Sequence, residues 1–289
     1  MTRVGVLGGG QLGRMLALAA HRLGVAVQVL DPAADAPAGA VAPLTVARFD
    51  DGEALDAFAA GCDVVTFEVE TVPPAALRRL AAPGVEVAPG PAPPAVAGDR
   101  RAEKALFEKL GIGTAQWAPV ERRECLDVAL ATIGLPAMLK RCHGGFDGRG
   151  QRLATTTAAA REAAAELAGP AGDPLIVERA VSFRRELSVT VVRARDGDAV
   201  VYPLAENVTR DGMLAYSRVP APAGPWVIAQ AQAHALAVAE ELGHVGALTL
   251  ELLDTGDELL ALEIAPRVHN TAHWTIEGAR TSQFENHLR

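Results

Sequence analysis

Leu139 to Gln151 reads LKRCHGGFDGRGQ and, with IVERAV at 176–181 and LEIAPRVHNTAHW at 262–274, it decides which fold and site to expect. Lys140 ends an apolar run that predicts a β-strand, so its ammonium group should emerge at the strand end. Four glycines between residues 144 and 150 would let backbone N–H groups fold over phosphate oxygens, and Arg149 adds a planar fork of donors. The stretch predicts a flap over a magnesium nucleotide, as in an ATP-driven ligase. The alternative is a solvated lysine beside a structural loop.

Three glutamates would supply the acidic side of this site. Glu178 ends the strand predicted at 174–178, where a sheet edge could present a carboxylate to an adenine or a ribose. Glu251 and Glu263 flank the hairpin predicted at 245–265, and a three-residue turn would bring both onto one face, since side chains alternate along a strand. Both lie inside apolar runs, where an unpaired charge is costly. We therefore interpret them as magnesium ligands, against the alternative of scattered acids on a solvated hairpin.

A glycine-rich turn near the N-terminus offers a competing interpretation. Residues 8–13, GGGQLG, follow the apolar strand 4–7 and satisfy the G-x-G-x-x-G pattern of dinucleotide sites. Asp31 closes the next apolar run and could accept from a ribose hydroxyl. On its own the pattern leaves a dinucleotide site, a phosphate site at a helix start and a structural turn all open.

Composition and charge exclude several classes of protein. At 289 residues, of which 49% are hydrophobic, the chain can bury more than one core. A formal net charge of −8, from 27 Lys and Arg against 35 Asp and Glu, gives no electrostatic footprint for nucleic acid or an acidic membrane. No basic-then-apolar leader opens the sequence, and no apolar run approaches the roughly 20 residues of a membrane span. We expect a cytoplasmic protein.

The three cysteines, Cys62, Cys125 and Cys142, have no metal-binding spacing and suit a reducing compartment. Cys142 lies beside the flap and is the one candidate for a reactive thiol. The alternative is a small buried apolar residue.

Strands alternate with helices over the first third of the chain. Strands are expected at 3–8, 25–30, 63–67 and 84–88, and helices at 11–23, 52–60 and 74–81, the order of a parallel sheet. The proline-rich run 89–94 cannot continue either kind of element and predicts a linker. Asp99 then caps a helix through Leu110, which places a domain boundary near residue 95.

The order of elements changes after this boundary. Strands are expected at 136–140, at 174–178 and several times between 185 and 219, with helices at 156–168 and 226–242 before the hairpin. The fold class is therefore α/β followed by α+β.

Six ordered segments resemble one family over the whole chain. GVLGGGQLGRM, TFEVETVP, DRRAEKALFEKLGI, LKRCHGGFDGRGQ, APRVHNTAHWT and SQFENHLR are similar to the 5-(carboxyamino)imidazole ribonucleotide synthases of the ATP-grasp superfamily. The resemblance implies a Rossmann-like pre-ATP-grasp domain at 1–95 and an ATP-grasp domain at 96–289, with a lid subdomain at about 114–178. The small C-terminal domain usual in the family is expected to be absent.

The resemblance also implies an activity. Bicarbonate, ATP and aminoimidazole ribonucleotide would give the N-carboxylated ribonucleotide, ADP and phosphate through carboxyphosphate, in purine biosynthesis. Magnesium would be the cofactor, and a homodimer is expected.

Site residues follow from the resemblance position by position. The implied catalytic residues are Lys140, Asp147, Arg149, Arg267, His269 and Asn270. The implied ATP-binding residues are Arg100, Lys140, Gly145, Phe146, Asp147, Gly148, Arg149, Gly150, Gln151, Glu178, Arg179, Ala180, Val181, Glu186, Thr209, Leu262 and Glu263. The ribonucleotide would meet Gly10, Gln11, Leu12, Glu68, Glu70, Asp147 and Arg149, and the metal would meet Glu251 and Glu263. The glycine turn thereby becomes a phosphate site.

Three positions depart from the family pattern. Thr209 stands where the family usually has histidine, Leu262 where it has asparagine, and Ala36 where it has serine. Each change removes a polar contact worth roughly 0.5 to 1.5 kcal/mol net, which slows an enzyme more readily than it abolishes one.

Three other functions stay open at this point. They are another ATP-grasp purine enzyme, such as the formate-dependent glycinamide ribonucleotide transformylase, a non-catalytic ATP-binding protein, and an NAD-dependent dehydrogenase. Nothing after Asp31 supplies a hydride-transfer site for the last of these.

Overall fold

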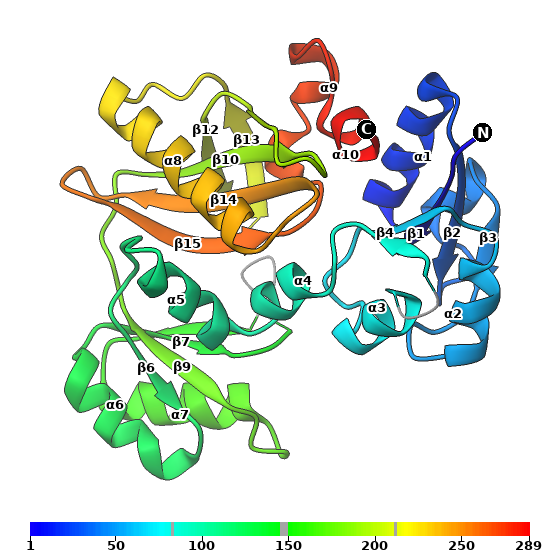
Figure 1. Ribbon diagram of the computed structural model, residues 1–289. Helices are drawn as coiled ribbons and strands as arrows, with labels where there is room; N and C mark the ends of the chain where they lie inside the picture. Colours follow the sequence, from blue (N-terminus) through cyan, green and yellow to red (C-terminus); the bar gives the residue numbers. More distant parts are fainter. Residues whose placement is uncertain (82–83, 145–149, 211–212) are drawn as a thin grey trace.

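Three β-sheets organise the chain in the computed structural model, which describes residues 1–81, 84–144, 150–210 and 213–289 (Figure 1). The first third builds a parallel sheet with strand order β3-β2-β1-β4-β5. Its elements are β1 (Arg3–Leu7), α1 (Gln11–Leu23), β2 (Ala26–Asp31), η1 (Pro37–Ala40), β3 (Leu44–Val46), α2 (Gly52–Ala59), β4 (Val64–Phe67), α3 (Pro74–Ala81) and β5 (Glu86–Val87). The predicted parallel sheet is confirmed. Strand β3 was not predicted, because three residues are too short for a periodic signal.

The proline-rich run is not a plain linker, and that prediction is wrong. Helix α4 (Ala92–Ala97) begins inside it and carries Pro93 and Pro94 in its first turn. Proline is tolerated there because the first N–H groups of a helix have no intrahelical acceptor. The boundary predicted near residue 95 falls within this helix and stays a prediction. Asp99 caps α5 (Arg100–Lys109) by accepting from the Arg101 backbone N–H, as expected.

The large sheet has the order β13-β12-β10-β14-β15, with β11 paired to β10. Its elements are β10 (Arg185–Arg193), β11 (Ala199–Val201), β12 (Ala205–Arg210), β13 (Met213–Arg218), α8 (Pro225–Glu241), β14 (Gly246–Asp254) and β15 (Leu259–Ala265). Helices α5 and α8 cover one face of this sheet and bury Phe107, Val189, Ala235 and Leu250 between them. The other face is left for the site.

A small antiparallel sheet, β6-β9-β7-β8, lies across from the large one. Its elements are β6 (Trp117–Val120), η2 (Arg123–Cys125), α6 (Leu126–Ile133), β7 (Ala137–Arg141), β8 (Gln151–Ala154), α7 (Thr157–Ala168) and β9 (Leu175–Arg179). Helices α6 and α7 cover its outer face through alanine and leucine side chains. The predicted lid, 114–178, spans nearly this whole sheet. As a separate subdomain it stays a prediction.

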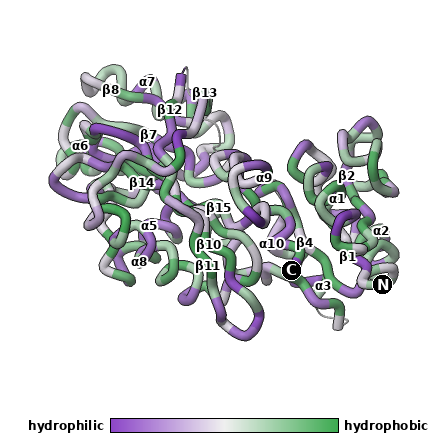
Figure 2. The backbone as a smooth tube through the Cα atoms, turned by 90° about the horizontal axis from the view of Figure 1, so that it is seen from above, coloured by the Kyte–Doolittle hydropathy of each residue, from purple (hydrophilic) through white to green (hydrophobic). Residues whose placement is uncertain are grey.

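The last residues join the parallel sheet to the large one. After η3 (Asn270–Ala272) and α9 (Thr275–Gly278), helix α10 (Gln283–Leu288) lies between α1 and β14 (Figure 2). Ser282 and Glu285 form a capping box that fixes the start of α10. His287 accepts from the Ala247 N–H at 3.0 Å and is hydrogen-bonded to Thr66 Oγ1 at 2.8 Å. One side chain therefore connects β14 to β4.

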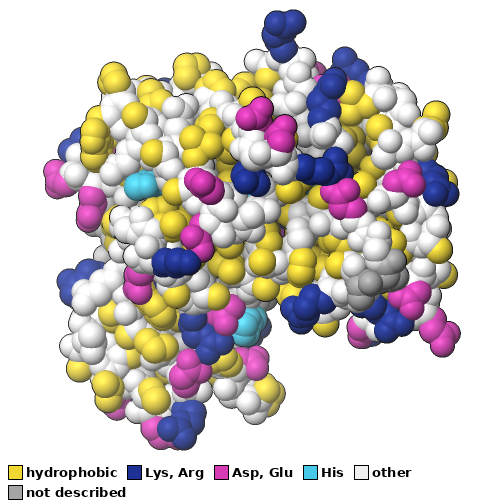
Figure 3. Space-filling model, viewed as in Figure 1, with side chains coloured by type: hydrophobic (Ala, Val, Ile, Leu, Met, Phe, Trp, Pro, Cys, Tyr) yellow, Lys and Arg dark blue, Asp and Glu magenta, His cyan; other side chains and the backbone are white. Residues whose placement is uncertain are grey.

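Charge is scattered over the surface. Acidic and basic side chains are interspersed on the face shown in Figure 3. Among the described residues, no helix is both long enough and apolar enough to cross a membrane.

Candidate functional site

A pocket of about 420 Å³ lies between the small sheet and the large sheet. The predicted ATP-binding residues that line it are Arg100, Lys140, Gln151, Glu178, Arg179, Ala180, Val181, Glu186, Thr209, Leu262 and Glu263. Glu251, His269 and Asn270 line it as well. A larger hollow of about 750 Å³ separates β1 and β4 from β10 and β11, but it contains none of the predicted site residues. The described residues that were predicted to bind ATP therefore gather in the smaller pocket.

Most of the predicted flap lies outside the part of the chain that the structure describes. Gly145, Phe146, Asp147, Gly148 and Arg149 lie outside the described residues, so the structure does not test their predicted roles. Gly150 has a φ of +75°, a backbone conformation that favours glycine. Its carbonyl accepts from the Arg141 N–H, and Gln151 pairs with Lys140 in the β7–β8 ladder. Gly150 and Gln151 therefore lie next to Arg141 and Lys140 at the edge of the small sheet.

Two buried lysines meet Glu178 at the base of the pocket. Lys140 Nζ lies 2.7 Å from Glu178 Oε2, and Lys104 Nζ lies 3.1 Å from Oε1. Burial alone would raise the pKa of Glu178, but the two lysines lower it to about 2. Burial lowers the pKa of Lys140. Sequence reasoning missed Lys104. Its spacing of four residues from Arg100 on a helix was the available signal.

Glu251 and Glu263 are directly opposite each other, but not because of the turn that was predicted. The loop has four residues, 255–258, between the paired Asp254 and Leu259. That register alone would place Leu262 opposite Glu251. A β-bulge between Glu251 and Leu252 takes Leu262 out of the ladder and brings Glu263 into line. The predicted three-residue turn is wrong, but the two acids do lie on one face of the hairpin, as predicted.

Glu251 lies among other acids, and few positive charges lie nearby to balance them. Burial, followed by the charges of Glu263, Glu186 and Glu103, raises the pKa of Glu251 well above its usual range. Arg100 donates to Glu263 at 3.3 Å, and Thr209 donates to Glu186 at 3.3 Å. Repelling carboxylates with little compensation suit a divalent cation. Within the described ranges, no group of three or more His, Cys, Asp or Glu is arranged to hold a metal ion.

Glu103 is a second residue that sequence reasoning missed. It is 1% exposed, and its Oε1 accepts from the Ile264 N–H at 2.7 Å. Burial and then the charge of Glu263 raise its pKa to about 8. The side chain therefore holds β15 in place next to Glu263.

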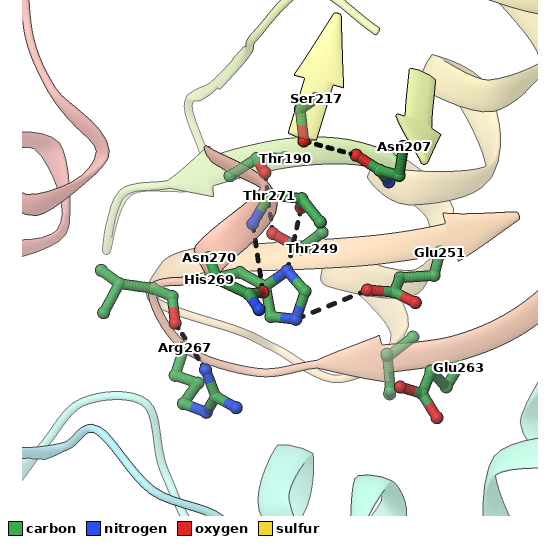
Figure 4. Close-up of polar contacts among 12 residues, drawn as sticks. Thr190, Asn207, Ser217, Thr249, Glu251, Glu263, Arg267, His269, Asn270 and Thr271 are labelled. Carbon is green, nitrogen blue, oxygen red and sulfur yellow. Dashed lines mark hydrogen bonds and ion pairs between the residues drawn. The ribbon is translucent and has the colours of Figure 1, made fainter. Parts of the chain in front are cut away.

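The loop after β15 carries Arg267, His269 and Asn270, and its His269 ring points toward Glu251 (Figure 4). His269 Nε2 lies 3.5 Å from Glu251 Oε1, and Nδ1 is hydrogen-bonded to Thr271 Oγ1 at 2.9 Å. Burial, followed by the charge of Arg267, lowers the pKa of His269 to about 3, so the ring is neutral at pH 7. Asn270 Oδ1 accepts from the Thr271 N–H at 3.1 Å.

Gln283 fixes this loop from beneath. Its Oε1 accepts from the His269 N–H at 2.8 Å, and its Nε2 donates to the His269 carbonyl at 2.6 Å. The side chain is fully buried. Gln283 lies in the segment SQFENHLR, which resembles the family, but no role was predicted for this residue.

Arg267 connects the loop after β15 to the segment that follows β4 of the parallel sheet. It donates to the Val268 carbonyl at 2.8 Å and forms an ion pair with Glu70. Its Nε is buried and has no hydrogen-bond acceptor among the described residues. A guanidinium N–H with no acceptor can bind an anion that enters between the domains.

Two backbone N–H groups of the glycine turn donate hydrogen bonds to carboxylates of the chain itself. The Gly9 N–H donates to Asp31 Oδ2 at 2.7 Å, and the Gly10 N–H donates to Glu68 Oε1 at 2.9 Å. Asp31 Oδ1 also accepts from the Ala33 N–H. Asp31 therefore braces the turn, and its interpretation as an acceptor for a ribose hydroxyl stays a prediction. A Cβ on Gly13 would lie 2.5 Å from the Gly8 carbonyl, which explains glycine there by close packing.

Three further residues were predicted to bind the ribonucleotide. Gln11 is exposed at the start of α1, whereas the Leu12 side chain is buried in the core, so Leu12 could offer only its backbone to a ligand. Glu70 follows β4 and forms an ion pair with Arg267.

Cys142 fits the alternative interpretation of a buried apolar residue. It is 2% exposed, and burial raises the pKa of its thiol to about 11. The described residues therefore contain no activated thiol beside the pocket.

Family models match two parts of the chain. A model described as "Ribonucleotide synthetase preATP-grasp domain" matches residues 1–97, and one described as "ATP-grasp domain" matches residues 105–284.

Named relatives agree with these models. The chain is 45% identical to the N5-carboxyaminoimidazole ribonucleotide synthase of Pseudomonas aeruginosa, over 99% of this chain and 78% of the relative. The crystal structure of N5-carboxyaminoimidazole ribonucleotide synthetase from Thermus thermophilus superposes with a TM-score of 0.92 at 47% identity, covering 99% of this chain and 77% of that one. An Aspergillus clavatus N5-carboxyaminoimidazole synthase in complex with ADP and 5-aminoimidazole ribonucleotide gives a TM-score of 0.91 at 32% identity, covering 100% and 76%.

Proposed function

The chain belongs to the N5-carboxyaminoimidazole ribonucleotide synthase family of ATP-grasp ligases, and from this premise we propose the reaction that its pocket performs. 5-Aminoimidazole ribonucleotide, bicarbonate and ATP are converted to N5-carboxyaminoimidazole ribonucleotide, ADP and phosphate, a step of purine biosynthesis. One observation carries the proposal. Paired lysines and paired acids line one pocket, and Arg267, two residues before the pocket residue His269, forms an ion pair with Glu70 of the N-terminal part of the chain.

The nucleotide would bind between the two sheets. Lys140 and Arg100 meet its phosphate groups as cations, and the end of β9, from Glu178 to Val181, lies along its adenine and ribose. Glu186 with Thr209 and the bulged Leu262 would complete the wall.

Bicarbonate would be activated at the loop after β15. A bicarbonate oxygen attacks the γ-phosphorus, the bond to ADP breaks, and carboxyphosphate forms. The amino nitrogen of the ribonucleotide then attacks the carboxyl carbon and loses a proton, while the C–O bond breaks and phosphate leaves. Arg267 holds the anions, Asn270 orients them, and the neutral His269 accepts a hydrogen bond without adding charge.

We also propose that Glu251 and Glu263 hold Mg²⁺. The raised pKa of Glu251 marks a place where positive charge is missing, which is the observation that supports a cation here. When bound, the ion would neutralise phosphate oxygens during transfer.

On the other side of Arg267, the ribonucleotide would meet the glycine turn and the acids Glu68 and Glu70. Burial raises the pKa of Glu68, and its carboxylate already occupies the Gly10 N–H. The ribonucleotide phosphate would have to replace Glu68 there, or bind at the neighbouring N–H groups of Gln11 and Leu12.

The experiment that tests the function is ADP release in the presence of Mg²⁺, with aminoimidazole ribonucleotide and bicarbonate each supplied or left out, and with formate in place of bicarbonate in a separate assay. Release that requires both substrates supports the synthase. Release that requires formate instead would favour the transformylase, and binding of ATP without any turnover would favour a non-catalytic protein.

The homodimer and the cytoplasmic location belong to the same proposal. Sedimentation as a monomer at micromolar concentration would contradict the dimer, and fractionation of the producing cells would test the location.

A further inference from the structure

Glu178 is shared by two lysines that reach it from different elements. Lys140 extends from β7 to Oε2, and Lys104 extends from α5 to Oε1. Exposure is 4% for Lys140, 3% for Glu178 and 1% for Lys104. At this end of the pocket, two buried lysines therefore share one carboxylate.

The two lysines are held differently. Lys104 also donates to Thr114 Oγ1 at 2.6 Å, and that hydroxyl donates to the Ala261 carbonyl on β15 at 3.0 Å. Lys104 is therefore fixed to the large sheet. For Lys140, Glu178 is the only acidic partner within ion-pair distance in the described part of the chain. Lys140 has to leave one partner to reach a new one, whereas Lys104 would have to leave two.

We propose that Lys104 is a positioning residue, the permanent counter-ion of Glu178, and that it frees Lys140 to bind the nucleotide phosphates. This inference rests on the proposed function, because it concerns the same pocket. When a phosphate group draws Lys140 away, Lys104 keeps Glu178 from becoming an unpaired buried carboxylate. Without Lys104, a phosphate group that draws Lys140 away would leave Glu178 with no lysine within ion-pair distance among the described residues. Adenosine carries no phosphate group, so its binding leaves the ion pair between Lys140 and Glu178 intact.

The test is the ratio of two dissociation constants, that of adenosine divided by that of ADP, each measured by calorimetry with Mg²⁺ present. The Lys104→Met variant should lower this ratio about tenfold or more, because only ADP has to separate Lys140 from Glu178. Lys109→Met is the matched control. Lys109 lies on the same helix and forms an exposed ion pair with Glu241 at 2.6 Å, so the ratio should stay at the wild-type value.

A structural role for Lys104 predicts something else. Loss of packing would weaken ADP and adenosine by the same factor, and an unchanged ratio in Lys104→Met would overturn the proposal. Lys104→Arg keeps the charge and should retain most of the ratio.

The double variant Lys104→Met with Glu178→Gln makes the sharpest distinction. Removing the carboxylate releases Lys140, so the ratio should recover to within about threefold of wild type. A ratio as low as that of Lys104→Met alone would contradict the proposal. If Lys104→Met does not fold, Glu178→Gln alone should keep at least the wild-type ratio. A lower ratio in Glu178→Gln would contradict the proposal. Failure of the wild-type chain to bind ADP would instead refute the proposed function.

Discussion

Glu251 and Glu263 face each other across β14 and β15 because a single bulged residue, Leu262, shifts the register beside them. The bulge converts a hairpin that would have paired glutamate with leucine into one that pairs two acids. Repulsion between these acids raises the pKa of Glu251 after burial has already done so. The hairpin thus retains an unfavourable charge pair, as expected of a site built to receive a cation.

Glu251→Gln should separate stability from activity. Removing one of the repelling charges is expected to raise the melting temperature of the Mg²⁺-free chain, while ADP formation falls by about 100-fold or more because the cation loses a ligand. Thermal unfolding and ADP release measured on the same sample check both. Glu258→Gln, in the exposed part of the hairpin loop, should change neither. A fully active Glu251→Gln would refute the metal assignment.

Glu103 should make stability depend on pH. Its pKa in the folded chain, about 8, is above the ordinary value of 4.5, so the folded state binds the proton more tightly. Stability is then greatest below about pH 4.5 and is lost as the pH rises through about 8. Glu103→Gln keeps an oxygen for the Ile264 N–H but does not titrate.

This variant should therefore flatten the profile between pH 5 and 8. At pH 8 it should gain on the order of 2 to 4 kcal/mol in the free energy of unfolding. Urea unfolding of both chains without Mg²⁺ provides the measurement. Parallel profiles for the two chains would show that Glu103 does not titrate in this range.

Gln283→Leu should lower kcat without affecting nucleotide binding. The substitution removes both hydrogen bonds to the His269 backbone, so the loop that carries His269 and Asn270 loses its fixed position. We expect kcat to fall about tenfold or more, with the KM for ATP within about twofold of wild type. Glu277→Gln, exposed on α9, serves as the control. An increase in the KM for ATP at unchanged kcat would contradict the assignment of Gln283 to this loop.

The cysteines should differ in reactivity. Cys142 and Cys62 are buried and have raised pKa values, whereas Cys125 is half-buried. An aromatic disulfide reagent should modify Cys125 before the other two, as peptide mapping would show. Cys142→Ser should keep nearly full activity. Rapid inactivation of the wild type through Cys142 would contradict this account.

Much of the fold could be predicted because its signals are local. The alternation of strands and helices before residue 95 and the Asp99 cap are written in short stretches of sequence. Lys140 and Glu178 could be placed at strand ends for the same reason, and both line the pocket.

The features that were missed depend on contacts between distant segments. Lys104 and Glu103 lie on an ordinary amphipathic helix, and only the tertiary structure shows that one meets Glu178 and the other the Ile264 N–H. The bulge at Leu262 could not be predicted from the pattern of apolar and polar residues in the hairpin sequence. Helix α4 was missed because proline was taken as a helix breaker, although the first turn accepts it.

The most direct test of the central claim uses bicarbonate labelled with ¹⁸O. If bicarbonate is phosphorylated by ATP before its carbon reaches the amine, one labelled oxygen should appear in phosphate for each ADP formed. This transfer should require aminoimidazole ribonucleotide. Unlabelled phosphate, or ADP release indifferent to the ribonucleotide, would contradict the account.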